Sequence, residues 1–367
     1  MKIKVQRKVF SEVMSIVAGV VNPRHTNPLV QNVLLDASKS GLLIKATDLE
    51  VSLQYQLNDA SVSKAGKVLL PAARLNGLLK DMSAETVELI ADDESVVVSA
   101  ERGKITLQTA DVEGFPGFPE FKQDNALSIK ASDFAKGLGW TGKSISPERG
   151  RYAFNGVLIT TGKNGIEFCG TDGRRLSYMK VAGKAKTYDF PIIIPRRGIE
   201  LFTRMAERAP DSDISLDIRE NEVVARAGNA IASTALIDGQ FPDYWTVIPR
   251  NNDKTYVARR ADLISSLRLA GHVTSVESQS VAMEISKQEI TFKTRSPGMG
   301  SAEVKLPVTY AGPDCRVGFD PRYLLDGLAL MTADDVTCEF KDNETGVIFH
   351  EGSKDKAFFL VMPLDVG

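Results

Sequence analysis

The sequence contains few of the residues on which disulfide-stabilised and metal-dependent proteins rely. Its 367 residues include only three cysteines and three histidines: Cys169, Cys315, Cys338, His25, His272 and His350. They are far apart and form neither a CxxC pair nor a Cys/His pattern with ligand spacing. We therefore expect no disulfide framework, no metal site and no cofactor.

Long apolar runs are missing as well. No stretch of about eighteen uncharged apolar residues occurs, and the opening segment, MKIKVQRKVF, alternates charged and apolar side chains. A membrane span and a signal peptide are therefore not expected, and we predict a cytoplasmic protein without a membrane partner.

Motifs of hydrolytic and nucleotide-binding enzymes are also absent. There is no GxSxG, P-loop or HExxH, and the GKSIS fragment at Gly142 lacks the glycine-rich loop of a phosphate site. The acidic pairs Asp92-Asp93 and Asp334-Asp335 leave open a metal-dependent nuclease or nucleotidyl enzyme, and a plain interaction scaffold is a further alternative. The inventory favours a protein that is not an enzyme.

Neither sign of charge dominates the chain. It has 45 Lys and Arg residues against 47 Asp and Glu residues, which gives a formal charge of −2. A nucleic-acid partner would therefore require the basic residues to gather on one surface.

The chain repeats itself three times. Alternating strands that lead into helical patterns begin near Lys2, Ala126 and Thr255, and a second strand-to-helix junction falls at Pro71, Pro195 and Asp320. These junctions are 124 and 125 residues apart, and Thr47-Asp48, Thr171-Asp172 and Thr294 recur at spacings of 124 and 123. Such a period indicates a triplicated domain and not a solenoid unit.

Each copy is predicted to be an α+β domain with two helices and several antiparallel strands. We place three tandem similar domains at residues 1–122, 123–250 and 251–367, below called the first, second and third repeat. Helices are predicted at 7–20, 72–82, 132–144, 196–208, 259–272 and 320–331. These windows carry a net charge of +6 and the rest of the chain −8, which favours a helix-lined surface that meets phosphates without reading bases.

Five segments, with the repeat, point to one family: TDLE at 47–50, NGVL at 155–158, TDGRRL at 171–176, QFPDY at 240–244 and FFLVMPL at 358–364. In this order and spacing they resemble the bacterial DNA polymerase III beta subunit, the sliding clamp family. The resemblance runs end to end. It implies a DNA clamp fold and a head-to-tail dimeric ring that encircles duplex DNA without sequence specificity.

The same resemblance implies a non-catalytic DNA polymerase processivity factor. Its implied partners are a second copy of the chain, the replicative polymerase subunit, an ATP-driven clamp loader, and other polymerases and repair proteins that carry clamp-binding peptides.

A partner-peptide pocket is the site that the resemblance implies most directly. The matching positions are Phe154, Thr171, Gly173, Arg174, Arg175, Leu176, Pro242, Thr246, Val247, Gly346, Leu360, Val361, Met362, Pro363 and Leu364. Taken alone, the apolar run FFLVMPL is either a last core strand or a partly exposed groove wall. Thr246 stands where an arginine is common, Arg174 where a histidine is common, and the tail ends Asp365-Val366-Gly367, so the peptide preference stays open.

DNA contacts and a subunit interface are implied as well. The DNA-binding candidates are Arg24, Arg74, Lys80, Lys143, Arg149, Arg151, Tyr152, Arg196, Arg197, Arg204 and Arg268. For the dimer interface, an edge strand with Ile105 and Leu107 would pair with the partner's third domain near His272 and Val273. Ile105 and Leu107 could equally face an internal core, and an unpaired apolar edge strand is itself a reason to expect oligomers.

Overall fold

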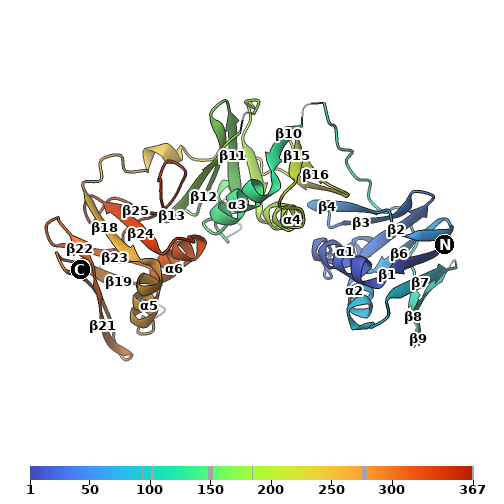
Figure 1. Ribbon diagram of the computed structural model, residues 1–367, viewed down its shortest axis with the longest axis horizontal. Helices are drawn as coiled ribbons and strands as arrows, with labels where there is room; N and C mark the ends of the chain where they lie inside the picture. The colour runs from blue at the N-terminus through green and yellow to red at the C-terminus, as the bar shows by residue number, and fades with distance from the viewer. Residues whose placement is uncertain are drawn as a thin grey trace. The chain divides into compact units, whose positions relative to one another are not determined.

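The computed structural model describes residues 1–367 except 93, 101–102, 125, 148–151, 184, 275–278 and 366–367, and it leaves the side chain of Tyr152 undescribed. Six α-helices are distributed along the described residues (Figure 1): α1 (Arg7–Val20), α2 (Ala72–Asp81), α3 (Ala131–Gly142), α4 (Arg196–Glu207), α5 (Arg260–Gly271) and α6 (Pro321–Leu330). All six predicted helices are confirmed, with bounds that differ by at most two residues.

Local chemistry explains where these helices begin. Asp320 caps α6, because its carboxylate accepts a hydrogen bond of 2.9 Å from the backbone N–H of Arg322, and Pro321 occupies the first helical position. Pro71 and Pro195 immediately precede α2 and α4. Within α1, Phe10, Val13, Met14 and Val17 are buried, as expected for an amphipathic helix.

The first and fourth sheets each belong to one repeat. Sheet A has the order β5 (Ser61–Lys64), β1 (Lys2–Gln6), β7 (Thr86–Ala91), β8 (Ser95–Ala100) and β9 (Gly103–Gln108). Sheet D has the order β21 (Gly300–Pro307), β20 (Glu289–Ser296), β19 (Val281–Ile285) and β23 (Cys315–Phe319). In both, every recorded strand pairing is antiparallel.

The other two sheets combine strands of neighbouring repeats. Sheet B runs β10 (Leu127–Lys130), β15 (Asp213–Ile218), β16 (Glu222–Ala227), β17 (Ala230–Ala235), β4 (Val51–Leu57), β3 (Gly41–Thr47), β2 (Asn32–Ser38) and β6 (Gly66–Pro71). Sheet C runs β14 (Ile192–Pro195), β11 (Gly156–Gly162), β12 (Gly165–Thr171), β13 (Arg175–Val181), β26 (Ala357–Val361), β25 (Val347–His350), β24 (Asp335–Phe340), β18 (Lys254–Arg259) and β22 (Thr309–Tyr310). We call the β4–β17 pairing the first junction and the β13–β26 pairing the second junction.

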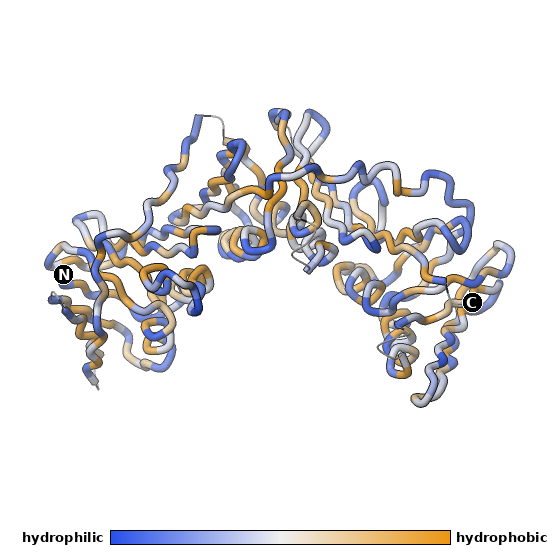
Figure 2. Tube along the Cα trace, turned by 180° about the vertical axis from the view of Figure 1, so that it is seen from behind, coloured by the Kyte–Doolittle hydropathy of each residue, from blue (hydrophilic) through white to orange (hydrophobic). Residues whose placement is uncertain are grey.

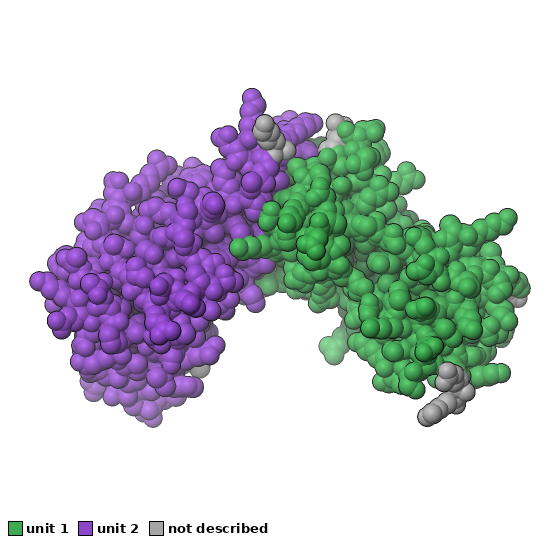
Figure 3. All heavy atoms as spheres, in the orientation of Figure 1, with its two compact units in different colours: residues 1–136, 194–237 green, residues 137–193, 238–367 purple. Residues whose placement is uncertain are grey.

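Two compact units result from this sharing (Figure 3). One comprises residues 1–136 and 194–237, and the other comprises residues 137–193 and 238–367. The units follow the shared sheets and not the sequence repeats, so the domain boundaries at 122/123 and 250/251 stay a prediction.

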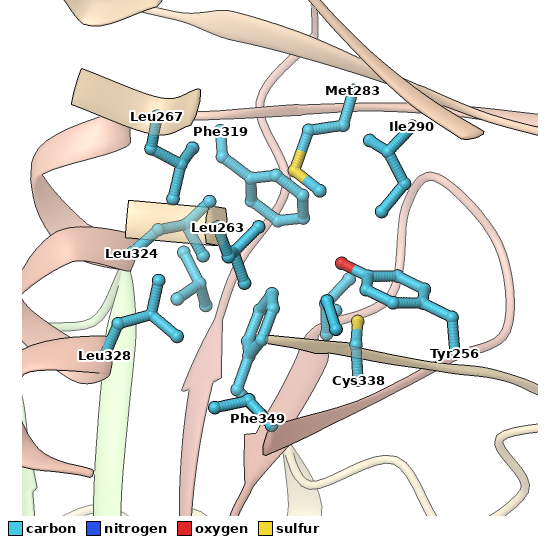
Figure 4. Close-up of a cluster of buried hydrophobic side chains, with 14 of the residues drawn as sticks. Tyr256, Leu263, Leu267, Met283, Ile290, Phe319, Leu324, Leu328, Cys338 and Phe349 are labelled. Atoms are coloured by element: carbon cyan, nitrogen blue, oxygen red, sulfur yellow. The ribbon is translucent and has the colours of Figure 1, made fainter. Parts of the chain in front are cut away.

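Apolar residues fill the interior of each unit, while many loop tips are hydrophilic (Figure 2). In the third repeat, Leu263 and Leu267 of α5 and Leu324 and Leu328 of α6 point toward side chains of the strands (Figure 4). The facing residues are Tyr256, Met283, Ile290, Phe319, Cys338 and Phe349. The two helices thus cover the sheets through one apolar core, as the amphipathic patterns predicted.

Candidate functional site: a turn, a C-terminal strand and an aromatic cluster

A tight turn between β12 and β13 organises the predicted peptide pocket. The hydroxyl of Thr171 donates to the carbonyl of Arg175 at 2.7 Å and accepts the N–H of Gly173 at 3.1 Å. The carboxylate of Asp172 accepts the N–H groups of Arg174 and Arg175, each at 3.0 Å. Gly173 has a φ of +87°, a conformation that favours glycine, so Thr171, Asp172 and Gly173 each have a geometric reason to be there.

Arg175 secures this turn to the third repeat. Its Nε donates to Asp172 Oδ2 at 3.0 Å, its Nη1 donates to Asp326 Oδ2 on α6 at 2.6 Å, and its guanidinium lies 4.6 Å from the ring centre of Tyr323. Arg175 is only 9% exposed. Its charge therefore has carboxylate partners within the chain, whereas Arg174 lies exposed beside it.

The apolar C-terminal run divides into a core strand and a surface segment. Leu360 and Val361 belong to β26, pair with Leu176 and Arg175, and are almost fully buried. Met362 and Pro363 are half-buried, and Leu364 is 37% exposed. The core interpretation therefore holds for Leu360 and Val361, and a groove wall formed by Met362, Pro363 and Leu364 stays a prediction.

Backbone contacts fix the position of this surface segment. The N–H of Met362 donates to the carbonyl of Arg174 at 2.8 Å, and the N–H of Leu364 donates to the carbonyl of Gly318 at 2.8 Å. A side chain at Gly346 would come within 3.0 Å of Leu360, so this position favours glycine.

An aromatic cluster that the sequence prediction missed is formed by Tyr178 and Phe358 of these strands and by Tyr244 and Trp245 of another segment. Tyr178 of β13 contacts Phe358 at 5.1 Å and Trp245 at 5.3 Å between ring centres, and Tyr244 contacts Trp245 at 5.1 Å. Burial, reinforced for Tyr178 by the nearby Glu167 carboxylate, raises the pKa of the Tyr178 and Tyr244 hydroxyls, which therefore stay neutral. Trp245 is 42% exposed and Val247 53% exposed, an unusual pair for a surface.

Three of the remaining predicted pocket residues lie next to Tyr244 and Trp245 in the sequence. Thr246 belongs to the short helix η3 (Tyr244–Thr246), and Pro242 and Val247 flank it, all three exposed. Phe154 is half-buried in η2 (Tyr152–Asn155). A signal for the cluster was present in the sequence, because one of only two tryptophans stands within DYWTV, next to the matched QFPDY segment.

The Thr47 turn of the first repeat has the same construction as the Thr171 turn. The Thr47 hydroxyl donates to the carbonyl of Val51 at 2.9 Å and accepts the N–H of Leu49 at 3.0 Å. The Asp48 carboxylate accepts the N–H groups of Glu50 and Val51 at 3.1 and 3.0 Å. Leu49 stands where Gly173 does and has a φ of +75°, the one positive φ among the described residues other than glycine.

Most predicted DNA contacts are exposed cations. These are Arg24, Arg74, Lys80, Lys143, Arg196, Arg204 and Arg268. Arg149, Arg151 and the side chain of Tyr152 lie outside the described residues. The observed helices carry a net charge of +4 and not the +6 of the predicted windows, because Lys143, Arg208, Arg259 and Asp320 lie just beyond the helix ends.

Arg197 differs from the other cations. Its Nη2 lies 2.6 Å from Asp48 Oδ2 and donates to the carbonyl of Val20 at 2.7 Å. Because the Asp48 side chain is 4% exposed, this ion pair stabilises the Thr47 turn, and Arg197 as a DNA contact stays a prediction without support from its surroundings.

The predicted interface strand lies at a sheet edge. β9 is the last strand of sheet A, and β21 is the last strand of sheet D in the described part of the chain. Leu107 is 7% exposed and Ile105 is half-buried, so Leu107 already belongs to the core of its own unit. His272 is exposed at the end of α5, and Val273 lies 3.9 Å from the position of a Cβ on Gly300 of β21.

The described residues contain neither a cluster of metal-ligating side chains nor a membrane-spanning helix. No group of three or more His, Cys, Asp or Glu side chains gathers there in a way that could hold a metal ion. No described helix is both long enough and apolar enough to span a membrane.

Comparisons with known proteins agree along the whole chain. Family models described as the N-terminal, central and C-terminal domains of the DNA polymerase III beta subunit match residues 1–119, 128–243 and 245–365. The chain is 26% identical to the Beta sliding clamp of Pseudomonas putida and 25% identical to that of Escherichia coli strain K12, in each case over 99% of this chain and 100% of the relative.

Solved structures give the same result for the fold. The DNA polymerase III subunit beta of Pseudomonas aeruginosa superposes with a TM-score of 0.92 at 26% identity, and the sliding clamp of Bartonella birtlesii bound to griselimycin with a TM-score of 0.93 at 26% identity. Both comparisons cover 100% of each chain. With three tandem domains built from antiparallel sheets and paired helices, and family models matching nearly every residue, this chain belongs to the DNA polymerase III beta subunit family.

Proposed function

We propose that this chain is a non-catalytic processivity factor. Two copies form a head-to-tail ring around duplex DNA, slide along it without sequence specificity, and tether polymerases through the peptide pocket. The ring is opened by an ATP-driven loader, and repair proteins with similar peptides use the same pocket.

One observation carries this proposal: the chain closes two of three equivalent junctions. β17 of the second repeat pairs with β4 of the first, and β26 of the third repeat pairs with β13 of the second. The corresponding strands that remain are β9 and β21, and both lie at sheet edges. Pairing β9 of one copy with β21 of the next would complete the series and cover two exposed edges.

The repeats also predict the register of that pairing. Ser52 lies opposite Ser233, and Leu176 lies opposite Leu360. In its own hairpin, Ala302 lies opposite Thr294 as Leu176 lies opposite Thr171, so Ala302 is the equivalent of Leu176. On the other strand, Thr106 lies opposite Val97 as Ser233 lies opposite Val224, so Thr106 is the equivalent of Ser233. Thr106 should therefore lie opposite Ala302 of the partner subunit.

A disulfide cross-link tests this ring. In a Cys315→Ser background, Thr106→Cys with Ala302→Cys should form covalent species of at least twice 40.0 kDa under mild oxidation, because opposite Cα atoms lie about 4.5–5.5 Å apart. The control pairs Thr106→Cys with Lys305→Cys, which is out of register. Equal cross-linking of both pairs, or only monomers by light scattering at micromolar concentration, would remove the ring.

Topology and tethering are tested next. A ring that is loaded on nicked circular DNA and then cross-linked should resist moderate salt, and it should be lost when the circle is cut. Deletion of residues 362–367 should abolish polymerase stimulation and leave the dimer intact, because Leu364 and the half-buried Met362 and Pro363 supply the pocket wall. If the protein were retained equally on cut and uncut circles, it would bind DNA directly, which would favour the nucleic-acid enzyme.

A further inference from the structure

We infer that a groove beside the Thr47 turn is a second peptide-binding site, selective for a basic, apolar segment of a partner protein. The inference rests on the peptide pocket of the proposed function as its template, and the experiment below separates failure of one from failure of the other. The groove has a volume of about 510 Å³ and lies entirely within the unit of residues 1–136 and 194–237. Its walls are the Thr47 turn, the segment of Pro116 and Pro119, the β15–β16 turn and the end of β17.

The groove occupies the place in the first junction that the peptide pocket takes in the second. Ser52 pairs with Ser233 as Leu176 pairs with Leu360. The N–H of Ala235 donates to the carbonyl of Glu50 at 3.2 Å, as Met362 does to Arg174.

The segment that links the first and second repeats, which includes Pro116, corresponds to the segment of Pro242 that links the second and third repeats. Pro116, which lines the groove, precedes Pro242 by 126 residues. Both sites are thus assembled on equivalent backbone.

The charge is reversed at one equivalent position, and a carboxylate is added at another. Glu50 stands where the second junction has Arg174, and Glu222 stands where it has Gly346. Glu220 adds an exposed carboxylate to the same wall. A ligand that approaches the groove therefore meets carboxylates, which favour lysine or arginine.

Arg219, the arginine of this wall, pairs with Asp217 and Glu222, so Glu50 and Glu220 are the carboxylates that a ligand would meet. Its Nη2 and Nε donate to Asp217 Oδ2 at 2.7 and 3.1 Å, and it also binds the Glu222 carboxylate and the carbonyl of Glu120. These contacts hold the linker against the β15–β16 turn and so shape the groove.

Leu49 supplies an exposed apolar side chain at the edge of the groove. The side chain is 58% exposed although it belongs to a left-handed residue with a φ of +75°, where the second repeat has glycine. Strained residues are retained most often where they serve binding or catalysis. Val51, Pro116 and Ala235 continue the apolar surface from Leu49 into the groove.

The experiment uses the full-length chain and a fluorescein-labelled peptide with the sequence Gly-Arg-Leu-Lys-Leu-Arg-Gly, followed by anisotropy at low salt. An acidic peptide with glutamates in place of the basic residues serves as the charge control. Leu49→Gly should weaken binding about tenfold through loss of apolar burial, and it should fold, because glycine suits this φ. Glu50→Gln with Glu220→Gln should weaken binding about fivefold and flatten its salt dependence.

Matched controls sit elsewhere on the surface. Glu94→Gln removes an exposed carboxylate outside the groove, and Leu269→Ala truncates a leucine that is 55% exposed on α5. Neither should change the affinity. Failure of the basic peptide to bind at millimolar concentration, or equal losses in control and groove variants, would overturn the second site.

Deletion of residues 362–367 separates the two proposals. Binding of the basic peptide that survives this deletion, while polymerase stimulation is lost, supports both sites. If groove variants leave binding unchanged and the deletion alone removes it, the peptide binds the second junction and the inference is wrong. If the groove behaves as expected but the deletion leaves stimulation intact, only the proposed pocket fails.

Discussion

Thr171 and Thr294 occupy equivalent positions in two hairpins, yet their surroundings differ. A tight turn follows Thr171 directly, whereas β20 and β21 stay paired beyond Thr294, as far as Ser296 opposite Gly300. Around Thr171, hydroxyl and carboxylate groups satisfy the turn, and all but one residue of the following strand β13 is buried. In the third repeat, arginine stands in place of Asp172, the hydroxyls of Thr294 and Ser296 are buried without a hydrogen-bond partner among the described residues, and β21 is largely exposed. The contrast teaches that a tight turn follows the threonine where the next repeat provides a partner strand, whereas the hairpin without such a partner in this chain continues past Thr294.

The largest effect on stability should come from Asp172, because the equivalent residue in the third repeat is Arg295. Asp172→Ala removes two backbone hydrogen bonds and one carboxylate partner of the buried Arg175, so it should lower the free energy of unfolding by about 3 kcal/mol. Arg295→Ala at the corresponding exposed position should change it by less than about 0.5 kcal/mol. Urea unfolding followed by circular dichroism measures both, and similar losses would erase the contrast.

A smaller difference is expected at the threonines themselves. Thr171→Val should cost about 1–2 kcal/mol, because the N–H of Gly173 loses its acceptor. Thr294→Val should be neutral or stabilising in the free chain, since its hydroxyl has no described partner to lose. Urea unfolding of both variants measures these changes in the free energy of unfolding. A loss in Thr294→Val as large as that in Thr171→Val would mean that the Thr294 hydroxyl does form a hydrogen bond.

The smallest effect on stability is expected at the positive-φ position of the Thr171 and Thr47 turns, which is Gly173 in one and Leu49 in the other. Gly173→Leu should destabilise the chain by about 1 kcal/mol, and Leu49→Gly should stabilise it by up to about 1 kcal/mol, because both positions require a positive φ. Differential scanning calorimetry of the two variants and the parent gives the sign. A destabilising Leu49→Gly would mean that packing of Leu49 outweighs its backbone strain.

Sequence reasoning succeeded where the signal was local. Asp320-Pro321 marks the start of α6, and the apolar spacing of Phe10, Val13 and Met14 marks the buried face of α1. The period of the repeats placed all six helices, because a shared fold repeats the same capping and spacing.

Long-range pairing was beyond such reasoning. Nothing near Ser52 in the sequence specifies Ser233 as its strand partner, and nothing near Arg175 specifies Asp326. The aromatic cluster around Tyr178 was missed for the same reason, because Trp245 reaches it from another segment. Leu107 could be assigned to an edge strand but not to one face of it, since both faces of an edge can be apolar.

Sheets B and C have a consequence for how such a chain could be divided. A fragment of residues 123–250 would keep β10 and β15–β17 from one sheet and β11–β14 from the other, so each would end in a newly bared strand. Expressed alone, that fragment should precipitate or swap strands, whereas residues 1–122 would retain the whole of sheet A and expose one new edge, β4 of sheet B. The unit that repeats in the sequence is therefore not a unit that folds when it is separated from its neighbours.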